Sequence, residues 1–292
     1  MRTHPLTDQV ADAVNQFFLD TWPFADDGER KKFLGADFSR FVCYLFPYSR
    51  DDRLRLVCEI MTHLALIDDI LNGLSLKDGR ALNDKLIALS RAKALPDRNL
   101  PLECIWQGFG KCDKELANDV LQHCVDFMNA QTDPRRLSKM NLEQYLEWRK
   151  DDVSKKFLSA LICFTRGIHL TEEEWVLIGP VDSNAARHVS VINDIWSYEK
   201  ELKAVTLLGT EGSTMANAVD IFADEVSIPI ESAKRVLYRL CREWELVHDT
   251  LAAEVLAKRD SPALRIYLKD NEYQMSGNEI WSRLTFRYSV AR

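Results

Sequence analysis

Apolar residues recur at the spacing of an α-helix through almost the whole chain, and this periodicity constrains the fold more than any other feature. Residues 10–22 show it in simple form, with apolar side chains three or four positions apart until Pro23 interrupts the pattern. Half-buried strands would instead alternate apolar and polar residues, and the sequence contains no sustained alternation. The chain is therefore predicted to be all-α, with about ten helices packed around an apolar interior.

Glycine, proline and polar clusters separate the periodic segments and mark where helices end. Residues 207–213 contain two glycines and are predicted to form a flexible loop. No repeat, low-complexity tract or linker divides the sequence, so residues 1–292 are expected to form a single domain. Helices are predicted at residues 10–22, 29–44, 50–71, 79–95, 102–129, 141–169, 171–179, 182–203, 215–225, 230–256 and 277–288.

Charge and composition limit the classes of partner. The net charge is −7 and the isoelectric point is near 5.5. No nucleic-acid partner is expected, because phosphate backbones are bound by dominantly basic surfaces. A small anionic ligand bound by a few local cations remains compatible with this balance. No apolar run approaches the roughly 18 residues that cross a bilayer, so no membrane span is expected.

Three oxygen-bearing side chains share one face of a predicted helix. Asn193, Ser197 and Glu201 recur every fourth residue, directly after the apolar run 189–192. An amide oxygen, a hydroxyl and a carboxylate are hard donors that suit Mg²⁺ better than Zn²⁺. Taken alone, the pattern is more simply explained by a solvated helix face carrying polar pairs, and only the rest of the chain favours a cation site.

A second acidic cluster ends the predicted helix 50–71. Asp68 and Asp69 are adjacent, follow the apolar run 65–67, and lie near the negative end of the helix dipole. Burial and the helix dipole both disfavour two negative charges here. A divalent cation would offset both effects, whereas a solvated helix terminus would avoid burial. Two oxygen clusters on separate helices of a bundle could face each other across a cavity and bind Mg²⁺ together with a diphosphate.

Four segments in register resemble the motifs of class I terpene synthases, in particular the fungal-type sesquiterpene cyclases. Residues Asp68-Asp69-Ile70-Leu71-Asn72 are similar to the aspartate-rich motif DDxxD/E/N, with Asn72 in place of the commoner acid. Residues 193–201 match the motif NDxxSxxKE at every defining position. Residues 145–149 resemble the stretch that carries the diphosphate-sensing arginine, and residues 277–288 resemble the C-terminal segment that ends in an Arg-Tyr pair. Residues 1–45 carry no motif of this kind.

The resemblance implies a class I terpenoid synthase fold, a helical bundle around a central active-site cavity. It implies that Asp68 binds two of three Mg²⁺ ions, while Asp69 supports the neighbouring hydrogen bonds. It also implies that Asp152 connects the sensing arginine to a helix break, with the Val153 carbonyl beside it. By the same resemblance, the third Mg²⁺ is bound by Asn193, Ser197 and Glu201, and the diphosphate accepts hydrogen bonds from Arg149, Lys200, Arg287 and Tyr288.

The resemblance further implies that Trp281 lines the cavity, where an aromatic face can stabilise a carbocation. Phe41, Leu64 and Phe157 are additional candidates for the lining. The implied activity is a Mg²⁺-dependent terpene cyclase that ionises a linear isoprenyl diphosphate, most simply farnesyl diphosphate, and releases a sesquiterpene hydrocarbon or alcohol. A homodimer is compatible with the family.

Three other functions remain open at this point. A diterpene cyclase would use geranylgeranyl diphosphate and would share the same motifs. An isoprenyl diphosphate synthase would share the fold, but it needs two aspartate-rich motifs, and the second motif here is NDxxSxxKE. An all-α scaffold protein without catalysis would leave the register of the four motifs unexplained.

Thiol and ionisable side chains outside these motifs are predicted to have ordinary structural roles. The seven cysteines lack metal-site spacing and follow no signal peptide, so they are expected to be reduced core thiols of a cytoplasmic protein. His63 and His188 are predicted to be hydrogen-bonded core histidines. The pairs Lys31-Lys32 and Lys155-Lys156 are predicted to be solvated.

Overall fold

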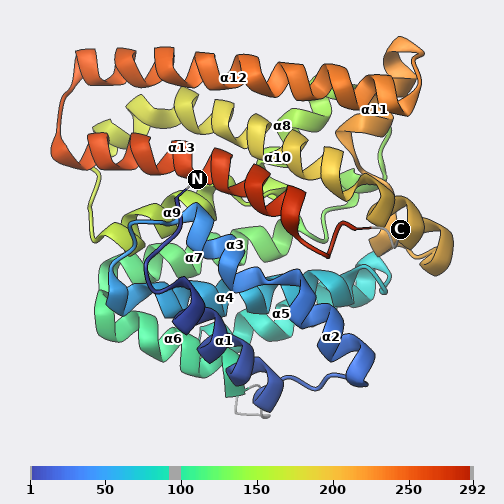
Figure 1. Cartoon of the computed structure of the whole chain (residues 1–292), viewed down its shortest axis with the longest axis horizontal. Coiled ribbons are helices and arrows are strands. Elements are labelled where there is room, and N and C mark those ends of the chain that lie inside the picture. Colours follow the sequence, from blue (N-terminus) through green and yellow to red (C-terminus); the bar gives the residue numbers. More distant parts are fainter. Residues whose placement is uncertain (1, 92–99, 290–292) are drawn as a thin grey trace.

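The computed structural model describes residues 2–91 and 100–289, and every regular element in these ranges is helical (Figure 1). The all-α prediction is therefore confirmed. The elements are α1 (Thr7–Thr21), α2 (Asp27–Ala36), α3 (Phe38–Leu45), α4 (Asp51–Leu71), α5 (Leu76–Ser90), α6 (Leu100–Cys112), α7 (Lys114–Ala130), η1 (Pro134–Leu137), α8 (Leu142–Asp152), α9 (Lys155–Arg166), α10 (Glu172–Leu208), η2 (Glu211–Ser213), α11 (Ala218–Val226), α12 (Ile230–Lys258) and α13 (Pro262–Leu284).

The helices pack into two connected groups. Helix α10 packs against both α12 and α13, and α13 packs in turn against α3. Figure 1 shows α12 along one edge of the molecule, with α10 and α13 beside it and α1, α4 and α6 towards the opposite edge. One apolar core joins α1 to α7, α9 and α13 with parts of α10 and α12, and a second joins α8, α11 and other parts of α10 and α12. This arrangement leaves α4 and α10, which carry the two oxygen clusters, on different sides of the interior.

Helix α4 matches its prediction to within one residue. Asp51 and Asp52 occupy its first turn, where negative charge is favourable near the positive end of the helix dipole. Leu54, Val57 and Ile60 are fully buried, and burial of each such side chain contributes about 1.5–3 kcal/mol. The helix ends at Leu71, so Asp68 and Asp69 lie in its last turn as predicted.

Three segments predicted as single helices are each two helices. The segment 29–44 is broken at Asp37, whose φ of 51° is left-handed, and the segment 102–129 is broken at Asp113, whose side chain caps α7. The segment 141–169 is broken at Ser154, where φ is 58°. A break of one or two residues leaves the apolar faces almost in register, so helical periodicity does not reveal it.

Helix α10 is the opposite case, because Pro180 does not end it. The predicted helices 171–179 and 182–203 are one element that begins at the capping box of Thr171 and Glu174. Proline at position 180 removes the donor to the carbonyl of Val176, and Val176 is 77% exposed, so water can replace that bond. The continuous helix holds Asn193, Ser197 and Glu201 in a fixed relation to the rest of the bundle.

The last helix begins earlier and ends sooner than the predicted range 277–288. Gly277, interpreted as a helix start, lies inside α13, and a Cβ at this position would be 2.6 Å from the carbonyl oxygen of Tyr44. The glycine therefore permits close approach of α13 to α3. Helix α13 ends at Leu284, so Arg287 and Tyr288 follow the helix rather than belong to it.

The remaining structural predictions have mixed outcomes. Residues 207–208 end α10 and residues 211–213 form η2, while positions 92–95 of the predicted helix 79–95 lie outside the described residues. All seven cysteines are free and five of them are buried. No helix among the described residues is long and apolar enough to cross a membrane.

Candidate active site

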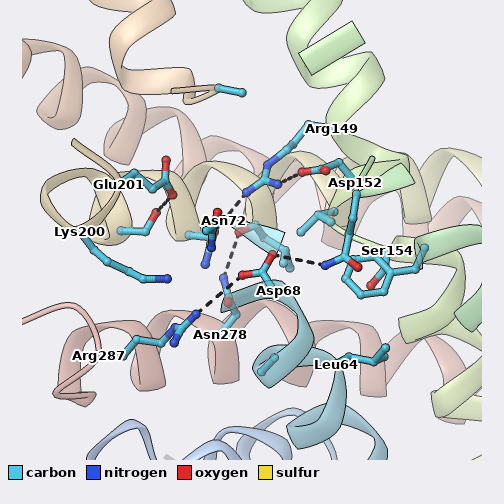
Figure 2. Close-up of a pocket in the computed structure, with 18 of the residues that line it drawn as sticks. Leu64, Asp68, Asn72, Arg149, Asp152, Ser154, Lys200, Glu201, Asn278 and Arg287 are labelled. Atoms are coloured by element: carbon cyan, nitrogen blue, oxygen red, sulfur yellow. Dashed lines mark hydrogen bonds and ion pairs between the residues drawn. The ribbon is translucent and has the colours of Figure 1, made fainter. Parts of the chain in front are cut away.

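All nine predicted site residues line a single pocket (Figure 2). Its volume is about 270 Å³, and α3, α4, α7, α8, α9, α10, α13 and the segment after α13 all contribute to its wall. Figure 2 shows Arg149, Lys200, Glu201 and Arg287 arranged around Asp68. The residues brought together are Asp68, Arg149, Asn193, Ser197, Lys200, Glu201, Trp281, Arg287 and Tyr288.

The acidic cluster at the end of α4 is tied to basic side chains across the pocket mouth. Both carboxylate oxygens of Asp69 accept hydrogen bonds from Arg287 at 2.6 Å, and Lys200 Nζ lies 3.3 Å from Asp69 Oδ1. Burial opposes ionisation of Asp69, but the charges of Arg287 and Lys200 outweigh it and lower the pKa of this carboxyl. Asp68 lies beside this pair, with Oδ2 3.7 Å from Arg287, and accepts a 3.3 Å hydrogen bond from Gln131.

The oxygen cluster on α10 is organised by hydrogen bonds. Ser197 Oγ donates to Glu201 Oε1, and Asn217 Nδ2 donates to Glu201 Oε2 at 2.9 Å. The Asn193 amide donates to the Tyr288 hydroxyl at 2.7 Å. Burial, together with the nearby charge of Asp194, raises the pKa of the Glu201 carboxyl.

Arg149, in the last turn of α8, is fixed by carboxylates on two helices. It forms an ion pair with Asp152 and donates to Asp194 Oδ1 at 3.1 Å and to Asn193 Oδ1 at 3.2 Å. Asp194 is completely buried and also accepts a hydrogen bond from Tyr145 at 2.7 Å. The guanidinium is therefore held at the pocket wall beside the α10 cluster, ready to donate to an anion.

The break between α8 and α9 lies directly beside this arginine. Helix α8 ends at Asp152, Val153 follows it, and Ser154 takes a left-handed conformation before α9 begins. Asp152, Val153 and Ser154 all line the pocket. The helix break that the family resemblance implied is thus present where the resemblance placed it.

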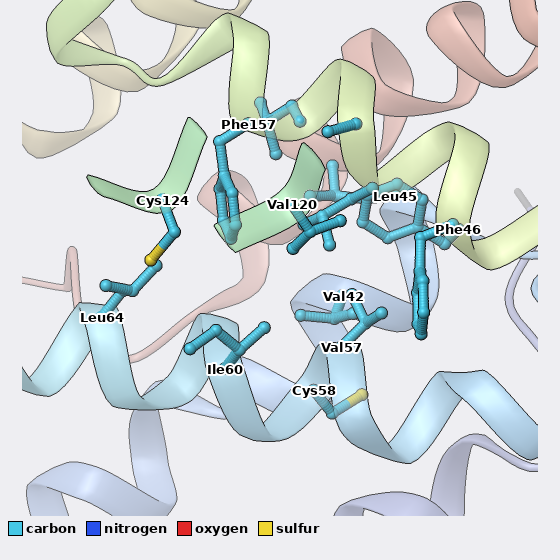
Figure 3. Close-up of a cluster of buried hydrophobic side chains, with 14 of the residues drawn as sticks. Val42, Leu45, Phe46, Val57, Cys58, Ile60, Leu64, Val120, Cys124 and Phe157 are labelled. Atoms are coloured by element: carbon cyan, nitrogen blue, oxygen red, sulfur yellow. The ribbon is translucent and has the colours of Figure 1, made fainter. Parts of the chain in front are cut away.

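Below this polar rim the pocket is apolar and aromatic. The ring of Trp281 packs against Phe41 at 4.5 Å between centroids, and its Nε1 donates to the carbonyl of Ala36 at 3.0 Å. Phe127 and Phe157 stack with centroids 6.4 Å apart. Figure 3 shows Phe157 pointing from α9 towards α4, which carries Leu64 and Ile60, and Phe157 and Leu64 both line the pocket. Aromatic faces in a water-poor pocket suit a hydrocarbon and attract cations.

The donor set fits a hard divalent cation. The α10 cluster offers the Asn193 amide oxygen, which accepts from Arg149, and the Ser197 hydroxyl, which donates to the Glu201 carboxylate. Glu201 is a buried carboxyl with a raised pKa, and a bound cation would offset the desolvation of its charged form. Asp68 offers a half-exposed carboxylate from the opposite helix. Asn193, Ser197, Glu201 and Asp68 are therefore the residues that could hold such ions.

Several polar residues of the site were not identified from the sequence. Gln131 and Arg136 line the pocket in the irregular segment around η1, where no periodic pattern marks them. Asn278 lines it from α13, and Asn217 binds Glu201 from the N-cap of α11. Only Asn217 carries a local signal, because asparagine before an apolar run is typical of a helix start.

Two predictions about buried ionisable groups were wrong. Lys155 is not solvated but only 4% exposed, and it pairs with Asp182, whereas Lys31, Lys32 and Lys156 are exposed as predicted. His63 is buried, but neither ring nitrogen has a hydrogen-bond partner, and burial lowers its pKa to about 4. A histidine can evidently occupy an apolar core in its neutral form.

His188 matches its prediction. Its Nε2 lies 3.2 Å from Glu245 Oε1 and the ring is completely buried. Arg242 contacts His188, Glu245 and Glu279 with one guanidinium nitrogen, so this cluster already contains its own cation. The cluster connects α12 to α10 and α13.

The comparisons with known proteins agree with this geometry. The family model described as terpene synthase family 2, C-terminal metal binding, matches residues 59–245, and its subject implies the use of a divalent metal. The (+)-aristolochene synthase TS1 of Penicillium expansum is 45% identical over 98% of this chain and 88% of its own length. The aristolochene synthase of Aspergillus terreus is 44% identical over 98% and 91%.

Solved structures show the same fold. The crystal structure of aristolochene synthase from Penicillium roqueforti superposes with a TM-score of 0.86 at 42% identity, covering 97% of both chains. A single-residue variant of cucumene synthase superposes with a TM-score of 0.77 at 16% identity, covering 99% of this chain and 98% of that chain, which shows the shared fold alone. With a family model matching more than half of its residues and relatives of this similarity, the chain belongs to terpene synthase family 2 and is a terpene cyclase.

Proposed function

We propose that this terpene cyclase uses Mg²⁺ to ionise farnesyl diphosphate and cyclises the resulting allylic cation to aristolochene, a C15 hydrocarbon. The observation that carries the proposal is the convergence of two oxygen clusters and four hydrogen-bond donors at the mouth of one aromatic-lined pocket. The names of the relatives support aristolochene as the product. A C15 product requires a C15 substrate, which favours farnesyl over geranylgeranyl diphosphate.

The proposed metal ligands divide between the two clusters. Asp68 would hold two Mg²⁺ ions, and Asn193, Ser197 and Glu201 would hold the third. When bound, the three ions supply positive charge that stabilises the departing diphosphate. The raised pKa of Glu201 supports this assignment, because a bound cation would offset the burial and the Asp194 charge that raise it.

The proposed diphosphate donors are Arg149, Lys200, Arg287 and Tyr288. Arg149 is preorganised by Asp152 and Asp194, so little reorientation is needed when charge develops on the leaving group. The Arg287 side chain is 12% exposed, and its charge is held at the mouth by the partly exposed Asp69. Tyr288 binds Asn193 and lies edge-on to Trp281, which places its hydroxyl at the boundary between the polar rim and the apolar wall.

The apolar wall is proposed to receive the carbocation. Trp281 and Phe41 form one aromatic side, and the hydrogen bond from Trp281 to Ala36 fixes the orientation of the indole ring. An aromatic face attracts a desolvated cation by about 2 kcal/mol or more. Phe157 lies on another side of the pocket, and exclusion of water protects the cation from early capture.

Incubation of the purified chain with Mg²⁺ and either farnesyl or geranylgeranyl diphosphate tests this function, with volatile products identified by gas chromatography and mass spectrometry. Aristolochene from the C15 substrate is the expected result. Another cyclic C15 product would support cyclase activity but contradict aristolochene as the product. A longer diphosphate would indicate chain extension, and inert substrates at high enzyme concentration would overturn catalysis.

Assembly and location are further parts of the proposal. The chain is proposed to fold as one domain over residues 1–292, to form a homodimer and to act in the cytoplasm. Light scattering after size-exclusion chromatography measures the mass in solution, and a monomer at micromolar concentration would contradict the dimer. A single calorimetric unfolding transition supports the single domain. Cell fractionation tests the location.

A further inference from the structure

A lysine is buried at the first position of α9, immediately after the helix break. Lys155 is 4% exposed, whereas its neighbour Lys156 is exposed. Two effects disfavour an ammonium here. Burial lowers the pKa of Lys155, and the start of a helix is the positive end of its dipole. A charge kept against both penalties needs a specific set of partners.

Those partners come from three helices. Lys155 Nζ lies 3.2 Å from Asp182 Oδ1 on α10, and it donates to Ser159 Oγ on α9 at 2.8 Å. It also lies 3.4 Å from Gln274 Oε1 on α13 and 6.0 Å from the ring centroid of Tyr267. The ammonium is therefore the point where α9, α10 and α13 meet.

Asp182 completes the network from the other side. Its carboxylate accepts hydrogen bonds from the Tyr267 hydroxyl at 2.8 and 2.9 Å, from Asn271 Nδ2 at 2.8 Å and from Ser159 Oγ at 3.0 Å. None of these described side chains lines the catalytic pocket. The network lies behind the pocket wall and can affect catalysis only through the backbone that it holds.

The backbone it holds is the helix break. Only residues 153 and 154 separate Lys155 from Asp152, which pairs with Arg149 at the pocket. Ser154 has a φ of 58°, a conformation that a non-glycine residue keeps only when its surroundings enforce it. With α9 fixed at its first residue, the chain direction at Ser154 and the position of Asp152 are fixed as well.

We propose that Lys155 and Asp182 are positioning residues that hold the break between α8 and α9, and with it Arg149, in the arrangement that binds the diphosphate group. The proposal rests on the proposed function, because it assigns the diphosphate to Arg149. A purely structural role explains the pair poorly, since well-packed apolar residues usually replace a buried ion pair without loss of stability. A positioning role does require this ion pair, because its length and orientation set where α9 begins relative to α10.

The test compares Lys155→Met with Lys156→Met, which removes the same charge one residue away at an exposed position. Two quantities are measured: the single-turnover rate of farnesyl diphosphate consumption with Mg²⁺, and deuterium uptake by the amides of residues 149–158 without substrate. Lys155→Met is expected to slow the single-turnover rate at saturating enzyme by about ten- to a hundredfold and to increase deuterium uptake. Lys156→Met is expected to match the wild type in both.

A double variant separates positioning from stability. Lys155→Met leaves Asp182 as an unpaired buried charge, so the double substitution Lys155→Met/Asp182→Asn removes that charge and is expected to melt at a higher temperature than Lys155→Met. The proposal expects the double variant to remain slow and its break to exchange rapidly. A stable double variant with the wild-type rate and wild-type deuterium uptake would overturn it.

The two readouts also keep this proposal distinct from the proposed function. Wild-type protein that leaves farnesyl diphosphate intact would overturn the substrate assignment. Deuterium uptake does not depend on the substrate, so it still decides whether Lys155 holds the break. Equal uptake in Lys155→Met and wild type would overturn the positioning role, whatever the activity.

Discussion

The two oxygen clusters of the site differ in how the fold supports them. Asp68 and Asp69 lie in the last turn of α4, are 48% and 40% exposed, and are held by ion pairs from distant segments. Asn193, Ser197 and Glu201 lie within a long continuous helix and are held by hydrogen bonds. One half of the site is therefore organised by charge at the surface, and the other by a buried polar network.

The carboxyl groups of the two clusters also differ in the direction of their pKa shifts. The charges of Arg287 and Lys200 overcome burial and lower the pKa of Asp69, whereas burial and Asp194 raise the pKa of Glu201. Exposed ion pairs form and dissociate at small cost, while a buried network is costly to leave incomplete. We infer that the α10 cluster is the preorganised half of the metal site and the α4 cluster is the half that adapts when diphosphate binds.

Removal of a ligand from the preorganised half is expected to have the largest effect. Asn193→Ala and Glu201→Ala should each lower turnover of farnesyl diphosphate by about 10²- to 10³-fold, because the transition state loses charge stabilisation. The helix should survive, since α10 is supported by packing against α12 and α13. Turnover at saturating Mg²⁺ and thermal melting monitored by circular dichroism check both parts. A near-wild-type rate in either variant contradicts the metal assignment.

The adaptable half is tested by a matched pair of neighbours. Asp68→Asn removes a proposed ligand and should lower turnover by about 10²-fold. Asp69→Asn weakens a partly exposed pair with Arg287 and Lys200, a contact of about 1 kcal/mol, so turnover should fall by only about fivefold. The ratio of the two rate losses is the measurement. Equal losses would show that both carboxylates bind metal.

The two halves are joined by the turn after α10, and a glycine substitution tests that connection. Thr210 donates to the carbonyl of Asn72 at 2.6 Å, and a Cβ on Gly212 would lie 2.0 Å from the carbonyl oxygen of Leu71. Gly212→Ala should push the turn away from α4 and raise the Mg²⁺ concentration for half-maximal activity by about tenfold. Gly110→Ala is the control, because nothing lies within 4 Å of its Cβ position. An unchanged Mg²⁺ dependence in Gly212→Ala would show that this turn does not couple the α4 cluster to the α10 cluster.

Helical periodicity predicted the fold class and the bounds of α4, because both depend on local spacing of apolar residues. It could not predict the breaks at Asp37 and Ser154, since a left-handed residue changes neither composition nor period. Pro180 misled in the other direction, because the exposed turn before it tolerates a missing hydrogen bond. Local signals thus predict where helices form better than where they end.

The site was predictable to the extent that its residues lie in recognisable motifs. Asp68, Arg149 and Asn193 all line the pocket, and their roles as ligands and donors stay predictions. Lys155 was predicted to be solvated because two of its partners, Asp182 and Gln274, are remote in sequence, with Gln274 119 residues away. A charged residue's environment depends on such long-range packing, which no local pattern contains.

The smallest expected effect concerns two histidines, each five residues before a cluster. His188, before Asn193, has Glu245 as a partner, whereas His63, before Asp68, packs edge-on against Trp22 without a hydrogen bond. The pKa of His63 is lowered to about 4, so between that value and its unfolded pKa near 6.5 only the unfolded chain binds the proton. The contribution of His63 to the free energy of unfolding is therefore fully present above pH 6.5 and is lost as the pH falls towards 4.

At pH 5 this histidine should lower the free energy of unfolding by about 2 kcal/mol relative to pH 7. His63→Leu has no proton to bind, so its stability should fall less over the same range. Urea unfolding of both proteins at pH 7 and pH 5 measures the difference, and all other titrating groups cancel because the two proteins share them. Equal losses of stability would mean that the α4 histidine is protonated in the folded chain, and that α4 accommodates charge in its interior as well as at its acidic end.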